Sequence, residues 1–166
     1  PAHVSALNLQ PADVESILKA NPGLFKGFGE IGMYKDAYKG TSPDDTSLLP
    51  FYEIANKYGL VVMMHPDYGQ EKAIEKILKD YPNVKFLFHG YQLQFNPDLL
   101  GRYPNAYLSV DDIFLDIQNE GQSSSLYGDK SKEEFIPKFK RDYNKIQDDL
   151  LKNWKESIEK YHDKFL

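Results

Sequence analysis

Short apolar runs alternate with amphipathic stretches along most of the chain. Four runs rich in Val, Leu and Phe are bounded by Gly, Pro or Asn: Leu24–Gly32, Leu60–His65, Val84–His89 and Ala106–Val110. Continuous apolar runs of this length are typical of strands that are buried on both faces. We therefore expect four parallel strands at these positions, and a further short strand at Val4–Leu9.

The stretches between these runs carry apolar residues at helical spacing. One helix is expected to open at Gln10–Asp13 and to end at Asn21–Gly23, and others to span about Asp44–Tyr58, Gln70–Asp80 and Pro97–Arg102. Strands that alternate with helices in this way predict an α/β fold with a parallel sheet and right-handed crossovers. We expect residues 1–115 to form these βα units.

The last third of the chain has a different pattern. Residues 116–132 are polar, small and unpatterned, so we expect a mobile loop there, acting as a lid. From residue 133 to residue 166, apolar side chains recur every three or four positions from Phe135 to Phe165, which predicts a long amphipathic helix. This helical segment is expected to pack against the body or a partner, within one α/β domain over 1–166.

Three of the expected strands end on residues of types that can bind metal ions: Glu30, His65 and His89. The intervals between them suit a barrel of about 250 residues, in which each of eight βα units takes about 31 residues. Parallel strands present their carboxyl ends at one rim, where such folds bind ligands. Imidazole and carboxylate groups suit zinc, iron and related divalent ions. We therefore expect a metal site, in which Glu30 is either a ligand or a proton acceptor.

The composition narrows the class of protein. With 166 residues, the chain can bury a single-domain core but is short of a complete barrel. The net charge is −5 and the basic residues are scattered, which does not favour nucleic acid. There is no cysteine, and this excludes disulfides and thiolate zinc ligands. No apolar run is long enough to cross a membrane, so we expect a soluble protein, cytoplasmic or exported, with a processed or truncated start at Pro1.

Four motifs around the strand ends resemble strands four to seven of the amidohydrolase superfamily, closest to the amidohydrolase-related and TatD-like metal-dependent hydrolases. They are Gly27–Gly32 (GFGEIG), Val62–His65 (VMMH), Tyr81–Gly90 (YPNVKFLFHG) and Tyr103–Asp111 (YPNAYLSVD). The resemblance implies a partial TIM (β/α)8 barrel of the metal-dependent hydrolase type. It also implies Glu30, His65 and His89 as ligands of one or two divalent ions, zinc above all. The implied reaction is hydrolysis of an amide, ester or related bond in a small-molecule substrate.

The sequence departs from this family near both ends. The family's first strand carries a His-x-His pair, whereas His3 stands alone here. The family's eighth strand supplies an aspartate, whereas this sequence ends at Phe165–Leu166 inside the expected helix. With Val4–Leu9 as strand three, the chain covers strands three to seven. We therefore expect a portion of a larger hydrolase, inactive by itself, that associates through the 133–166 helix or with the missing part of the barrel.

Several polar residues and two other functions stay open. Asp36 and Asp67 follow expected strands and are candidates for substrate contacts. Asp111 and Asp112 are expected to cap a helical turn, and His3 and His162 to be surface residues. A metal-free glycoside hydrolase would use Glu30 with Asp111 or Asp67, about 5–10 Å apart. A non-catalytic binding module would keep these rim residues as relics and associate through the stripe from Phe135 to Phe165.

Overall fold

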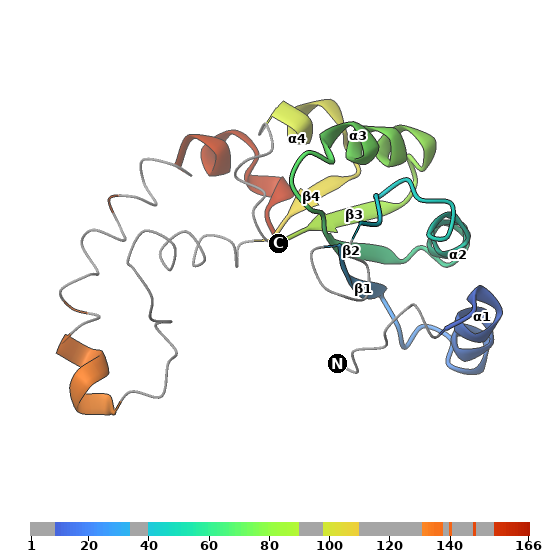
Figure 1. The fold of residues 1–166 in the computed structure, drawn as a ribbon, viewed down its shortest axis with the longest axis horizontal. Coiled ribbons are helices and arrows are strands. Elements are labelled where there is room, and N and C mark those ends of the chain that lie inside the picture. Colours follow the sequence, from blue (N-terminus) through green and yellow to red (C-terminus); the bar gives the residue numbers. More distant parts are fainter. Residues whose placement is uncertain are drawn as a thin grey trace.

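A parallel sheet forms the centre of the protein. The computed structural model describes residues 9–33, 40–89, 98–109, 131–137, 140, 148 and 155–166. Within them, four strands lie side by side in the order β1-β2-β3-β4, and all adjacent pairs are parallel (Figure 1). The bounds are Gly27–Gly32 for β1, Val61–His65 for β2, Lys85–Phe88 for β3 and Ala106–Leu108 for β4. The expectation of an α/β fold with four parallel strands is confirmed.

Helices alternate with these strands as the apolar spacing predicts. They are α1 (Pro11–Ala20), α2 (Leu49–Tyr58), α3 (Glu71–Asp80) and α4 (Asp98–Arg102). The expected start of the second helix at Asp44 is wrong, because residues 44–48 are not helical and include turns at 44 and 46–48. The Asp45 carboxylate accepts hydrogen bonds from the backbone and hydroxyl of Ser47, at 2.9 and 2.7 Å, and such local bonds compete with a helical backbone. None of the described helices has the length and apolar character that a membrane span requires.

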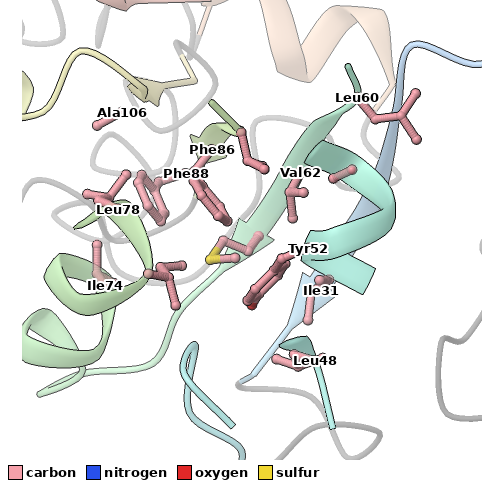
Figure 2. Packing of buried hydrophobic residues seen from close by; sticks show 14 of the residues in the cluster. Ile31, Leu48, Tyr52, Leu60, Val62, Ile74, Leu78, Phe86, Phe88 and Ala106 are labelled. Carbon is pink, nitrogen blue, oxygen red and sulfur yellow. The ribbon is translucent and has the colours of Figure 1, made fainter. Parts of the chain in front are cut away.

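One hydrophobic core joins the sheet to α2, α3 and α4. Alternate strand residues point into it and are almost fully buried: Val62, Met64, Phe86, Phe88, Ala106 and Leu108. Figure 2 shows Val62, Phe86, Phe88 and Ala106 of this set among the core side chains. The helices contribute Tyr52, Ile74, Ile77, Leu78, Leu99 and Leu100. Burying a side chain of this size stabilises the fold by about 1.5–3 kcal/mol. The intervening strand residues, such as Met63, Leu87 and Tyr107, are half-buried and face the opposite side of the sheet.

The C-terminal segment returns to the sheet. Residues 155–160 are helical, a 3-10 turn, η3, follows at His162–Lys164, and Phe165 forms a parallel bridge with Leu108. The Leu166 N–H donates to the Leu108 carbonyl at 2.9 Å. The expectation that the sequence ends inside a helix is therefore wrong. The exposed backbone edge of β4 needs hydrogen-bond partners, and an extended backbone at Phe165 and Leu166 provides them.

Packing of the amphipathic stripe against the body is confirmed at its C-terminal end, since Ile158, Tyr161 and Phe165 contact the core. Near its start, residues 132–137 are helical, and the Ser131 hydroxyl accepts a hydrogen bond from the Glu134 N–H at 3.3 Å. The strand expected at Val4–Leu9, apart from its last residue, lies outside the described residues. So do most of the expected 116–132 loop, His3, Asp36, Asp111 and Asp112.

Candidate metal centre

Glu30 owes its direction to an irregularity in β1. Phe28 pairs with Val62 and Ile31 pairs with Met64, so three steps along β1 match two steps along β2. In a regular strand, residues three apart point to opposite faces. The extra residue lets Phe28 and Ile31 both pack against the core and turns Glu30 to the other face of the sheet. Bulges of this kind commonly re-aim a side chain beside a functional site.

The glycine before Glu30 allows this close approach of β1 to β2. Gly29 has a φ of 144°, a backbone conformation that residues other than glycine rarely adopt. A Cβ at this position would lie 2.9 Å from the Met63 Cβ and would overlap the Met63 carbonyl oxygen. The peptide bond that joins Gly29 to Glu30 is cis. Glycine at position 29 is therefore a steric requirement for the observed position of Glu30.

The two histidines come from the next two strands at the same rim. His65 is the last residue of β2, and its carbonyl accepts a hydrogen bond from the Met33 N–H at 3.0 Å. His89 directly follows β3, and its N–H donates to the Met64 carbonyl at 3.1 Å. The side chains of Glu30, His65 and His89 are only 12%, 6% and 14% exposed. The sequence-based expectation that these three residues meet at one rim is confirmed.

The donor atoms of these three residues, here called the Glu-His-His group, lie within 4.8 Å of one another. The Glu30 Oε1 atom is 3.1 Å from His89 Nε2 and 3.5 Å from His65 Nδ1. The two imidazole rings are 4.8 Å apart and meet edge to face. Two ligands that each bind a tetrahedral zinc ion at about 2.0–2.1 Å are about 3.4 Å apart. The donor chemistry and spacing therefore fit a divalent cation, although an ion pair between Glu30 and a protonated imidazole has similar distances.

Asp67 has a local structural contact in the loop that follows β2. Its carboxylate accepts a hydrogen bond from the Tyr68 N–H at 2.8 Å, and its own N–H donates to the Gln70 side-chain oxygen at 2.9 Å. Asp67 does not belong to the Glu-His-His group, and its contact with a substrate stays a prediction. Asp36, the other expected substrate contact, lies outside the described residues. His162 is exposed in η3, as expected.

Two rim loops are linked by a contact that the sequence does not predict. The Gln70 side-chain amide donates to the Thr41 carbonyl at 2.7 Å, so it joins the loop after β2 to the loop after β1. The loop after β1 is also held from the core, because the buried Tyr52 hydroxyl donates a 2.8 Å hydrogen bond to the Pro43 carbonyl. No local sequence signal marks Gln70, because its partner is distant along the chain.

Comparison with known proteins gives little further information. No protein-family model matches the chain, and no curated protein matches it. A similar solved structure is described as an uncharacterized TIM-barrel protein, Bb4693, from Bordetella bronchiseptica, with 23% sequence identity and a TM-score of 0.40. The match covers 61% of this chain and 48% of that one, so it spans about half the length of the solved chain.

Proposed function

We propose that this chain carries the metal site of an amidohydrolase-type hydrolase, in which Glu30, His65 and His89 hold a divalent cation. Zinc is the cation that we propose. The observation that supports this is the Glu-His-His group itself: three suitable donor atoms, from three adjacent strands, within 4.8 Å at one rim. A bound divalent cation would polarise a carbonyl group and lower the pKa of water to about 7. The substrate class is accordingly an amide, ester or related carbonyl compound.

The protein's own residues have distinct tasks in this proposal. His65 is 5% exposed, so its ring would shield a cation held by the group from bulk water. Glu30 would supply a negative charge to the cation, and a carboxylate can also take a proton from a reacting group. Met63 and Leu87 precede the two histidines by two positions and so lie below them on the same face. These apolar side chains lower the local dielectric and strengthen the interaction of charges at the rim.

Ion binding is the primary test of this proposal. The sequence lacks the His-x-His pair of the resembling family, so Glu30, His65 and His89 must hold the ion without it. The 166-residue chain would be stripped with a chelator and titrated with Zn²⁺ by calorimetry. We expect one high-affinity ion per chain. Replacing one of three ligands removes a large share of the binding free energy, so E30Q, H65A and H89A should each weaken binding by about 100-fold. H162A, which removes an exposed histidine, is the matched control.

Absence of stoichiometric binding, or equal binding by the three variants and wild type, would refute the metal site. The reaction itself is tested with chromogenic esters, lactones and anilides, where zinc-dependent hydrolysis that H65A abolishes is expected. Cleavage of aryl glycosides that survives the chelator would instead support the metal-free glycoside hydrolase. A chain that binds no ion and cleaves neither class would support the non-catalytic module.

A further inference from the structure

Ser109 continues the row of rim residues onto the fourth strand. Leu108, the last residue of β4, is 8% exposed and belongs to the core. The Ser109 N–H donates to the Phe88 carbonyl at 2.8 Å, so the parallel ladder extends one residue beyond the strand. Because side chains alternate along extended backbone, Ser109 faces away from the core. Its side chain therefore lies on the face of the sheet that carries the Glu-His-His group.

The register places Ser109 beside His89. Met64 pairs with Phe88, and Phe88 pairs with Leu108, so the next rung along the sheet joins His65, His89 and Ser109. Adjacent strands are about 4.8 Å apart, which puts the Ser109 backbone about 5 Å from that of His89. On β1, Gly32 pairs with His65, and Glu30 lies two residues before it at the other edge of the group. Ser109 therefore flanks the Glu-His-His group on the side opposite Glu30, and it is half-buried.

We propose that the Ser109 hydroxyl is a substrate-binding group that forms a hydrogen bond with the carbonyl compound held at the Glu-His-His group. A neutral hydroxyl is a poor ligand for zinc beside imidazole and carboxylate, but it both donates and accepts hydrogen bonds. With its backbone about 5 Å from that of His89, Ser109 would reach a molecule seated on a cation held there and would leave the cation's own ligands unchanged. This inference rests on the proposed function. It assigns orientation of the substrate to the end of β4, which Ser109 directly follows.

The experiment separates ion binding from ligand binding. Co²⁺ is added to the chelator-treated 166-residue chain in place of zinc. Its visible absorption reports the binding of the ion and of an added ligand. The probe is acetohydroxamate, a small carbonyl compound that binds metal ions through oxygen. We expect S109A to bind Co²⁺ as wild type does, within about twofold, and acetohydroxamate about 3- to 10-fold more weakly, as for loss of one neutral hydrogen bond. S109T, which keeps the hydroxyl, should restore most of the affinity.

Ser16→Ala is the matched control, because the Ser16 hydroxyl binds the Ala12 carbonyl within α1, away from the rim. Unchanged acetohydroxamate affinity in S109A, with Co²⁺ bound normally, would overturn the role of Ser109 and leave the proposed function standing. Weaker Co²⁺ binding in S109A would also overturn it, since Ser109 would then act on the ion's site. A wild-type chain that binds no Co²⁺ would overturn the proposed function and this inference together.

Discussion

The Glu30 Oε1 atom lies 3.1 Å from His89 Nε2, although β2 separates the strands from which the two side chains come. Strands with one strand between them are about 9.6 Å apart at the backbone. The two side chains must therefore lean toward each other across the middle strand, where His65 meets them. Side chains that merely share a rim need not converge in this way, and within the described parts of the chain this convergence is seen for Glu30, His65 and His89.

Zinc is expected to stabilise the fold through the Glu-His-His group. A ligand that binds only the folded state at 100 times its Kd raises the free energy of unfolding by about 2.7 kcal/mol. For a chain of this length, that corresponds to an increase in Tm of about 5–10 °C. Thermal unfolding followed by circular dichroism should show this increase in wild type and in H162A, and not in E30Q. An equal increase in E30Q would mean that zinc binds elsewhere.

The strand ends and the candidate ligands were predictable from the sequence for one physical reason. Parallel strands buried in a core form continuous apolar runs, and the polar residue that ends each run must lie at the common rim. The sequence alone therefore predicts that Glu30, His65 and His89 lie together. The register needed to make their side chains converge was not predictable from the positions of the runs alone.

The remaining features depend on contacts between distant parts of the chain. The bulge at Gly29 and Glu30 has a weak signal, since Phe28 and Ile31 are apolar and three apart, but helical and irregular segments share that spacing. The link from Gln70 to Thr41 and the pairing of Phe165 with Leu108 have no local signal. In each case, tertiary packing decides which backbone groups need a partner.

A side chain at Gly29 should disturb both stability and ion binding. Gly29→Ala places a methyl group against the backbone of Met63, in addition to the penalty for its positive φ. Gly59→Ala is the matched control, because Gly59 also has a positive φ, 64°, with open space around its Cβ position. Urea denaturation should show a loss of about 1–2 kcal/mol for the control and a further 1–3 kcal/mol, roughly, for Gly29→Ala.

Zinc titration of the same two variants distinguishes a local steric effect from general destabilisation. We expect Gly29→Ala to weaken zinc binding, because the methyl group forces β1 away from β2 and moves Glu30. Gly59→Ala should bind zinc as wild type does. If Gly29→Ala retained wild-type zinc affinity, the bulge would not be needed to position Glu30.

Asn105 is expected to stabilise the core without affecting the Glu-His-His group. It is 5% exposed, and its side-chain amide donates to the carbonyls of Leu78, Tyr81 and Val84 at 3.0–3.2 Å. Asn105→Ala leaves these carbonyls without that donor, so we expect a loss of about 1–3 kcal/mol in urea denaturation. Asn56→Ala, at an exposed position of α2, should have little effect. Reduced zinc stoichiometry in Asn105→Ala would contradict the separation of these roles.

Glu75 should make part of the stability depend on pH. Arg102 donates two hydrogen bonds to its carboxylate, at 3.0 and 3.1 Å, and the Tyr103 hydroxyl donates a third at 3.0 Å. These bonds, those from Arg102 foremost, lower the pKa of the Glu75 carboxyl below its ordinary value of 4.5. A lowered carboxyl pKa contributes stability that is fully present above the unfolded pKa and is lost as the pH falls through the folded one.

The Glu75→Gln variant tests this contribution. At pH 7 it should be less stable than wild type in urea denaturation. The difference should shrink as the pH is lowered below about 4.5, since Glu75 is then protonated first in the unfolded chain and, at lower pH, in the folded one. Glu133→Gln removes an equal charge from an exposed helical position and should show no such narrowing. A stability difference between Glu75→Gln and wild type that is constant from pH 7 to pH 3 would show that the Arg102 and Tyr103 contacts do not depend on the charge of Glu75.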